Sequence, residues 1–149
     1  MSGLFYWDTS TVVKLYAAEP DSPAYRALMK GRKERPVTSF LHRVELFYAL
    51  RNKEDRGEIV AGAAARLFST YQQHLADGRF HEIPWGVDVV DAARDALESC
   101  LAPPSPVKLR SLDGLHLGAM KSGGVTSLVT TDAYMRRAAS CLGLTLVDP

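Results

Sequence analysis

Hydrophobic residues in this chain fall into short continuous runs and, between them, longer stretches with helical spacing. Five runs predict strands over residues 4–7, 36–38, 80–84, 125–130 and 144–147. Apolar residues that recur every three or four positions predict helices over residues 12–16, 22–32, 41–55, 59–74, 87–101, 112–120 and 133–142. Strands that alternate with helices predict the α/β class, with a largely parallel central sheet packed between helices.

Turn-forming and capping residues support these boundaries. Ser39 and Ser111 are expected to cap the helices that follow them, because serine is a favoured N-cap residue. Gly57 is expected to end one helix, and the Pro-rich segment 103–106 to form an exposed loop. The chain has no internal repeat and no linker long enough to divide it, so residues 1–149 are expected to form one domain.

Composition narrows the class of protein without naming a function. The 46% hydrophobic and 23% charged residues are typical of a globular protein, and a net charge of +1 does not by itself indicate a nucleic-acid partner. No apolar stretch approaches the roughly 20 residues that cross a bilayer, and the N-terminus has no basic leader. We therefore expect no membrane association and a cytoplasmic location. Cys100 and Cys141 are expected to be two buried thiols, with a disulfide as the alternative.

Two acids directly follow predicted strands. Asp8 ends the run at residues 4–7, and Asp132 follows the run at residues 125–130. In open α/β sheets, ligands bind outside the carboxyl ends of the strands, so both acids are expected to point into one cleft. The alternative is that each aspartate only caps the next helix.

Two further acids lie inside predicted helices. Glu45 has Leu41, Tyr48 and Ala49 as its helical neighbours, so it is not on a solvated face. Asp113 lies in the first turn of its helix, where interaction with the helix dipole is the alternative explanation. Carboxylates that share a cleft repel one another unless a cation lies between them. Hard divalent cations such as Mg²⁺ or Mn²⁺ prefer oxygen ligands, and no His or Cys pair here has the spacing of a zinc site.

Four stretches, taken in order, resemble the PIN-domain nucleases, and most closely the VapC toxins of bacterial toxin–antitoxin modules. They are Tyr6-Trp7-Asp8-Thr9-Ser10, the segment 39–50 around Glu45, Leu112-Asp113-Gly114-Leu115-His116-Leu117-Gly118-Ala119, and Val129-Thr130-Thr131-Asp132. The segment 138–144 is also similar to the family's last helix. One departure is Gly114, where the family usually has alanine; a small residue is kept there.

This resemblance implies a PIN-like three-layer α/β/α sandwich with a mostly parallel sheet of four to five strands. It also implies an endoribonuclease that hydrolyses RNA with one or two Mg²⁺ or Mn²⁺ ions and an activated water. By matching position, Asp8, Glu45, Asp113 and Asp132 are the metal-binding and catalytic acids. Ser10 and Thr130 resemble the hydroxyl residues that support them. His116 is expected to be a hydrogen-bonded structural imidazole.

The resemblance further implies an RNA substrate, a VapB-like antitoxin partner and a homodimer. An Arg or Lys of the antitoxin is expected to enter the acidic cleft, since guanidinium pairs well with carboxylates. Basic residues should contact the RNA backbone. The candidates are Lys14, Arg43, Lys108, Arg110, Arg136 and Arg137.

Other functions remain open from the sequence. A haloacid-dehalogenase-like phosphatase also has an aspartate after its first strand, but it needs a second aspartate where this chain has Ser10. A PIN protein that processes RNA outside a toxin–antitoxin module is an alternative. So is a PIN module that binds RNA or a protein without cutting.

Overall fold

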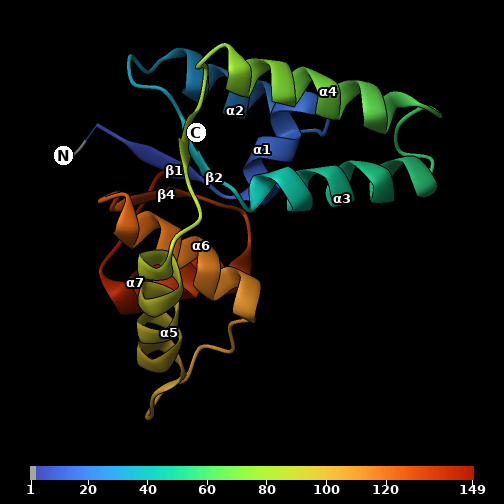
Figure 1. Cartoon of the computed structure of the whole chain (residues 1–149). Coiled ribbons are helices and arrows are strands. Elements are labelled where there is room, and N and C mark those ends of the chain that lie inside the picture. Colours follow the sequence, from blue (N-terminus) through green and yellow to red (C-terminus); the bar gives the residue numbers. More distant parts are fainter. Residues whose placement is uncertain (1–2) are drawn as a thin grey trace.

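A five-stranded parallel sheet forms the centre of the computed structural model, which describes residues 3–149 (Figure 1). Its strands are β1 (Phe5–Trp7), β2 (Val37–Ser39), β3 (His81–Ile83), β4 (Ser127–Val129) and β5 (Thr145–Leu146), in the spatial order β3-β2-β1-β4-β5. All four strand pairings are parallel. The predicted α/β class and the largely parallel sheet of four to five strands are therefore confirmed.

Seven helices cover the sheet in two layers (Figure 1). The layer on one face consists of α1 (Thr9–Tyr16), α2 (Ser22–Lys30), α3 (His42–Asp55) and α4 (Ala63–Ala76). The other layer consists of α5 (Val87–Leu101), α6 (Ser111–Ser122) and α7 (Ala133–Leu142). The molecule is thus a three-layer α/β/α sandwich, as the family resemblance implies.

Successive residues of β1 supply both hydrophobic cores. The side chain of Tyr6 packs with residues of α5, α6 and α7, whereas the side chain of Trp7 packs with residues of α1, α3 and α4. Both side chains are almost completely buried. This follows from the alternation of side chains along a strand, and it explains why the run at residues 4–7 is continuously apolar.

The helix predicted over residues 59–74 begins later than expected, at Ala63. Val60 is 74% exposed, and Gly62 has a left-handed backbone with φ of 86°, which the periodicity of apolar residues cannot reveal. The Glu54 carboxylate accepts a hydrogen bond of 2.9 Å from the backbone N–H of Ala64 and so caps the first turn. Gly57, with φ of 73°, ends α3 as predicted.

Three other local predictions need correction. Ser39 lies in β2, where its hydroxyl accepts a hydrogen bond from the backbone N–H of Leu41, so it is not the N-cap of α3. Ser111 is the first helical residue of α6 rather than its cap. Cys100 is buried but Cys141 is exposed, and both are free thiols. Cys141 lies in the last turn of α7, where the core no longer covers it.

Helices α5 and α6 pack unusually closely because of two glycines. A Cβ atom at Gly118 would lie 2.4 Å from the carbonyl oxygen of Val89 and 2.7 Å from the backbone nitrogen of Ala93. A Cβ atom at Gly114 would lie 2.6 Å from Cγ of Leu97. The alanine that is usual in the family at position 114 would not fit here without a shift of Leu97.

No helix in residues 3–149 is long and apolar enough to span a bilayer. The order of the strands indicates where on the sheet a ligand site is expected. The chain passes from β1 to β2 on one side and later returns to β4 on the other, so the switch point of the sheet, where open α/β sheets bind ligands, lies at the carboxyl ends of β1 and β4. Asp8 and Asp132 lie just beyond these two strand ends.

Candidate active site

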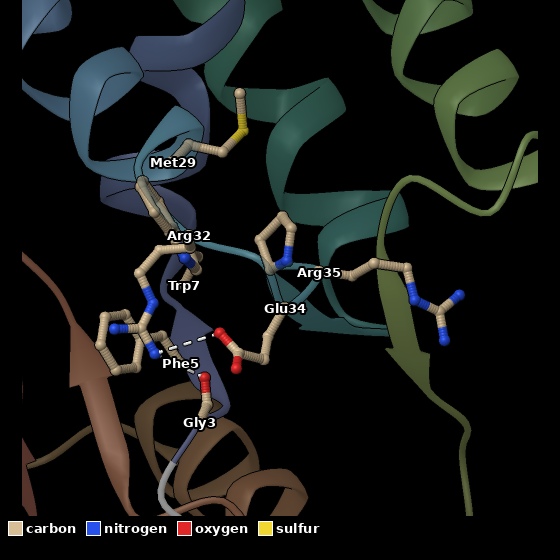
Figure 2. Close-up of a pocket in the computed structure, with 8 residues that line it drawn as sticks. Gly3, Phe5, Trp7, Met29, Arg32, Glu34 and Arg35 are labelled. Carbon is tan, nitrogen blue, oxygen red and sulfur yellow. Dashed lines mark hydrogen bonds and ion pairs between the residues drawn. The ribbon is translucent and has the colours of Figure 1, made fainter.

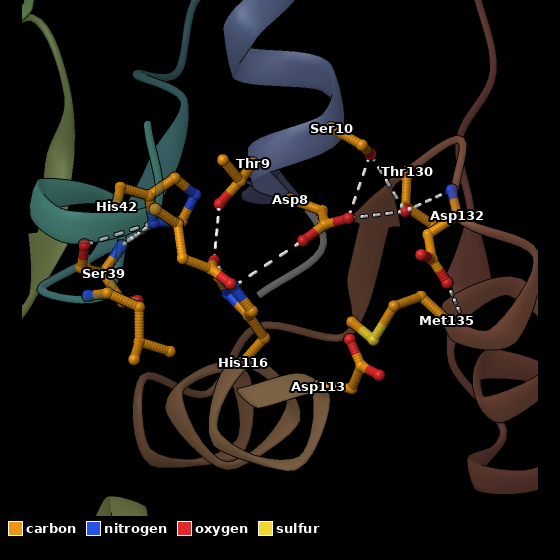
Figure 3. A network of polar contacts seen from close by, with 12 residues as sticks. Asp8, Thr9, Ser10, Ser39, His42, Asp113, His116, Thr130, Asp132 and Met135 are labelled. Atoms are coloured by element: carbon orange, nitrogen blue, oxygen red, sulfur yellow. Dashed lines mark hydrogen bonds and ion pairs between the residues drawn. The ribbon is translucent and has the colours of Figure 1, made fainter. Parts of the chain in front are cut away.

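The carboxylate of Asp8 is buried and held by two hydroxyl groups. Its Oδ2 atom accepts hydrogen bonds from Ser10 at 3.0 Å and from Thr130 at 2.9 Å, and the residue is only 7% exposed. The side chain makes no capping hydrogen bond to α1. Capping therefore does not explain Asp8, and both predicted supporting hydroxyls contact it (Figure 3).

His116 of α6 contacts Glu45 and faces Asp8, as Figure 3 shows for Asp8. Its Nε2 atom is hydrogen-bonded to Oε1 of Glu45 and lies 3.8 Å from Oδ1 of Asp8. Burial alone would lower the pKa of His116, but the hydrogen bond with Glu45 and the charge of Asp8 raise it. Burial alone would raise the pKa of Glu45, but His116 and the hydroxyl of Thr9, 2.8 Å from Oε1, lower it. The imidazole is thus a counter-ion for the first two acids.

Arg110 has the same relation to the other two acids. Its side chain donates to Asp113 from Nε at 3.2 Å and from Nη2 at 3.3 Å, and Nη2 lies 3.6 Å from Oδ2 of Asp132. The Arg110 side chain is 73% exposed, whereas Asp113 is buried. The guanidinium therefore lies across the mouth of the acid cluster.

The alternative explanations, that Asp113 and Asp132 serve only the starts of their helices, hold in part. Oδ2 of Asp113 accepts a hydrogen bond of 3.0 Å from the backbone N–H of Arg110 at the start of α6. Oδ1 of Asp132 accepts from the backbone N–H groups of Tyr134 and Met135, at 2.9 and 3.0 Å, and so caps α7. In each case the carboxylate also faces Arg110, so capping does not account for the whole arrangement.

Thr130 joins the two pairs of acids. Its hydroxyl donates to Asp8 and accepts a hydrogen bond of 3.0 Å from the backbone N–H of Asp132. Four acids that are distant in the sequence are therefore connected by one polar network at the carboxyl edge of the sheet. The structure brings together all four residues that the sequence singled out, and it places Ser10 and Thr130 beside them.

Three residues of this network, Thr9, Tyr6 and His42, were not identified as site residues from the sequence. Thr9 binds Glu45, and the hydroxyl of Tyr6 lies 2.6 Å from Nδ1 of His116 and 2.9 Å from Oγ of Ser39. The tyrosine in an otherwise apolar buried strand was a usable signal, because a buried hydroxyl requires a partner. His42 gave no such signal.

His42 is a fully buried, neutral imidazole behind the acids. Its Nε2–H donates to the carbonyl of Trp7 at 2.7 Å, and its Nδ1 accepts from the N–H of Ser39 at 3.0 Å. Burial, together with the neighbouring His116, lowers the pKa of His42 from 6.5 to about 4. This ring ties the start of α3 to β1, and thereby fixes the helix that carries Glu45.

The predicted RNA-contacting residues divide according to their surroundings. Lys14 is buried, with a side chain only 8% exposed, and pairs with Glu19 at 3.0 Å and Asp21 at 2.9 Å. It has no free surface for a phosphate, so this prediction does not hold for Lys14. Arg43 forms two hydrogen bonds with Glu82, at 2.8 and 2.9 Å, on the outside of α3.

The other basic candidates lie on the segments that carry Asp113 and Asp132. Lys108 and Arg110 precede α6, and both are exposed. Arg136 of α7 binds the carbonyl of Thr130 at 3.0 Å and pairs with Asp148. The guanidinium of Arg137 lies 4.8 Å from the ring centre of Tyr134. Of these four residues, Arg110 contacts the acids directly, with Asp113 and Asp132 as its partners.

The chemistry of the cluster fits a hard divalent cation. Its donors are carboxylate oxygens, with hydroxyl groups that orient them, and positive charge is already drawn to both acid pairs. Within residues 3–149, no three His, Cys, Asp or Glu side chains already stand in a metal-coordinating arrangement. Arg110 and His116 take up carboxylate oxygens instead, so a cation would have to displace at least one of them.

Comparison with known proteins agrees with this fold. The family model described as PIN domain matches residues 5–140, and the chain therefore belongs to the PIN-domain family. Within it, the chain is 34% identical over 146 residues to ribonuclease VapC46 of Mycobacterium tuberculosis, covering 97% of this chain and 96% of the relative. It is also 34% identical to ribonuclease VapC35 of the same species, over 98% and 97% of the two chains. The predicted resemblance to VapC proteins is confirmed.

Solved structures support the fold independently of sequence. The crystal structure of VapC20 from Mycobacterium tuberculosis, described as a sarcin-ricin loop cleaving toxin, superimposes with a TM-score of 0.72. The match covers 97% of this chain and 99% of that chain at 15% identity. The VapBC2 complex of Rickettsia felis, bound to a DNA fragment from its promoter, gives a TM-score of 0.63 at 15% identity over 97% of each chain. At these identities the likeness shows the fold alone.

Proposed function

We propose that this protein is a Mg²⁺- or Mn²⁺-dependent endoribonuclease that acts as the toxin of a VapBC-type toxin–antitoxin module. The observation that carries the proposal is the network joining Asp8, Glu45, Asp113 and Asp132 at the carboxyl edge of the sheet. Full-length relatives named ribonuclease VapC support the choice of RNA hydrolysis for this acidic site. The domain is taken as residues 1–149.

The four acids act as a ligand set that the hydroxyl residues keep in place. Ser10 and Thr130 hold Oδ2 of Asp8, which leaves Oδ1 facing His116 and the cleft. Oδ1 of Asp132 is committed to α7, which leaves Oδ2 for a cation. A divalent cation bound here supplies activation of a water and stabilisation of charge on the phosphate. Orientation of the carboxylates before binding lowers the cost of assembling this site.

Positive side chains have two functions in the proposed site. His116 faces Asp8 and Glu45 from the buried side, where a protonated imidazole offsets part of their negative charge. Arg110, at the exposed mouth, is positioned to hold a phosphate of the RNA once its carboxylate partners bind a cation. Lys108, Arg136 and Arg137 extend this positive rim on both sides of Asp132 and Asp113.

The proposed protein partners are a VapB-like antitoxin and a second copy of this chain. The solved VapBC2 complex of a structural relative supports the first. A basic side chain of the antitoxin would enter the acid cluster, and the pairing of Arg110 with two of the acids supports this mode of inhibition. Size-exclusion chromatography of the chain alone and with the product of the neighbouring gene tests both partners.

RNA cleavage with and without metal tests the proposed activity. The purified protein is incubated with transfer RNA and ribosomal RNA in Mg²⁺ or Mn²⁺, and separately in EDTA. Metal-dependent products from the wild type, absent for Asp113→Asn, are the expected result. RNA binding without any cleavage in either metal would overturn the nuclease and favour the non-cleaving alternative. A neighbouring antitoxin gene distinguishes a toxin from an RNA-processing nuclease.

A further inference from the structure

A hollow with an apolar floor and charged residues at its rim lies at the opposite edge of the sheet from the acids. It has a volume of about 340 Å³ and adjoins Pro36 and Phe80, which precede β2 and β3. The amino ends of parallel strands all lie at one edge, so this hollow is separated from the carboxyl-edge acids by the length of the strands. Its volume is within the range of pockets that bind small organic ligands.

The rim of this hollow is strongly basic. It is lined by Arg32, Lys33, Arg35 and Arg79, with Glu34 as the single acid. Such an excess of positive charge contrasts with a chain whose net charge is only +1. The hollow therefore carries a local excess of positive charge that is separate from the basic residues near the acids.

Only one of these four basic groups is fully engaged by the protein itself. Arg32 donates to the carbonyl of Gly3 at 2.8 Å, pairs with Glu34 at 3.4 Å and lies 3.8 Å from the ring centre of Phe5 (Figure 2). Arg35 points away from this pair and contacts only the carbonyl of Gly78 through its side chain (Figure 2).

Lys33 and Arg79 are exposed and available to a ligand. Among residues 3–149, no carboxylate lies within 4.0 Å of Lys33, Arg35 or Arg79. This sets them apart from Lys14 and Arg43, whose charges are paired with acids. Three unpaired cations around one hollow indicate an anionic ligand.

The floor of the hollow is apolar and partly aromatic. Leu15, Tyr16, Met29 and Phe80 line it. The Tyr16 hydroxyl lies 2.7 Å from Nδ1 of His74, so a hydrogen-bonded polar pair borders this surface. Burial and the nearby charge of Arg79 lower the pKa of His74. A ligand that fills the hollow thus combines a flat apolar body with a negative group.

We propose that this amino-edge hollow is an accessory RNA site that binds one nucleotide of a bound strand, with the base on the apolar floor and phosphates at Lys33, Arg35 and Arg79. This proposal rests on the proposed ribonuclease function. A basic groove with an aromatic surface is the usual composition of single-strand binding sites. An acidic peptide offers the charge but no flat ring for the floor, so RNA is the better match.

The position of the hollow has a consequence for the choice of substrate. An RNA that occupies the acids and the hollow at once must extend from one edge of the sheet to the other. An oligonucleotide too short to extend over that distance can reach only one of them. The accessory site therefore favours long or folded RNA over short fragments, without changing the chemistry at the acids.

Binding of fluorescein-labelled single-stranded RNA in EDTA tests the proposal separately from cleavage. The test variant is Lys33→Gln/Arg79→Gln, and the matched control is Arg66→Gln/Lys121→Gln, which removes the same charge from exposed positions on α4 and α6. The slope of log K against log salt is negative, and each lost single-strand phosphate contact reduces its magnitude by about 0.7. The test variant removes two such contacts, so its slope should be smaller in magnitude by about 1.4. The control should keep the wild-type slope.

The outcomes separate this proposal from the proposed activity. Weaker binding and a smaller slope for the test variant alone, with unchanged cleavage of a short RNA in Mn²⁺, support the accessory site. If the test variant keeps the wild-type slope, and the wild type cuts RNA, the accessory site alone is overturned. If the test variant instead loses binding to a labelled polyglutamate peptide and keeps its RNA affinity, the hollow is a protein-binding site and the proposal is wrong.

Discussion

The guanidinium of Arg110 lies 3.6 Å from the carboxylate of Asp132 while it also binds Asp113. One exposed side chain thus takes up two of the four acids of the proposed metal site. The protein carries its own counter-ion for this half of the cluster, and a divalent cation must compete with it. The strength of metal binding should therefore depend on Arg110.

Substitution Arg110→Gln should strengthen Mn²⁺ binding. Exposed ion pairs contribute about 0.2–1 kcal/mol, so the gain in affinity should be about 1.4-fold to fivefold. Isothermal titration calorimetry with Mn²⁺ measures it. Arg94→Gln is the matched control, because Arg94 pairs with Asp91 at the same three-residue spacing on α5, in an exposed position. Unchanged or weaker Mn²⁺ affinity for Arg110→Gln would show that the guanidinium does not compete.

Substitutions Asp8→Asn and Asp113→Asn should each reduce RNA cleavage at least about a hundredfold while the fold is kept. Either change removes a negative ligand but preserves the shape of a buried side chain. Cleavage assays in Mn²⁺ and thermal unfolding monitored by circular dichroism provide the two readouts. Asp95→Asn, on α5 and without a contact to the acid network, should retain full activity. Native-rate cleavage by either site variant would remove that residue from the catalytic set.

The two oxygens of Asp132 allow its roles to be separated. Asp132→Asn keeps a side-chain oxygen for the N–H groups of Tyr134 and Met135 but removes the negative charge. It should lose cleavage with little change in stability. Asp132→Ala also removes the cap and should lower the free energy of unfolding by a further amount of about 1 kcal/mol. Urea unfolding compares the two, and equal stability would mean that the cap contributes nothing.

His42 should remain neutral in the folded protein well below the pH at which an exposed imidazole protonates. Its pKa of about 4 lies below the ordinary value of 6.5, so the unfolded state binds this proton first as the pH falls. The contribution to stability is complete above about pH 6.5 and is lost toward pH 4, to a total of about 3 kcal/mol.

Nuclear magnetic resonance of labelled histidine measures this directly. The His42 ring should keep the chemical shifts of a neutral Nε2–H tautomer to about pH 5, whereas in urea-unfolded protein it should titrate near 6.5. A midpoint near 6.5 in the folded protein would show that the contacts with Trp7 and Ser39 do not hold the ring neutral.

Much of the fold could be predicted because both cores take their residues from the same strands. The continuous apolar runs at β1 and β4 indicate burial on both faces, and all five strands lie where such runs occur. The start of α4 could not be predicted, because it depends on a left-handed Gly62 and on the Glu54 carboxylate from the preceding helix. Neither appears in the local periodicity.

The acids of the candidate site could be predicted from the sequence. The pairing of His116 and Arg110 with these acids could not. Asp8 and Asp132 are marked by their positions at strand ends, and Glu45 by its apolar neighbours. The partnership of His116 with Glu45 depends on how α6 lies against the sheet, which the sequence does not specify. The burial of Lys14 has the same cause, since Glu19 and Asp21 reach it only through the turn after α1.

The absence of a side chain at Gly118 has a consequence for how this protein can change. Backbone atoms of α5 fill the place of its Cβ, so the backbones of the two helices are in direct contact there. Mutations on the solvent side of α5 can then tilt Asp113 and His116 together while Asp8 stays with the sheet. Substitutions that tune the cleavage rate during evolution are therefore expected on the solvent side of α5. Position 118 itself is expected to remain glycine, because any side chain there would clash with α5.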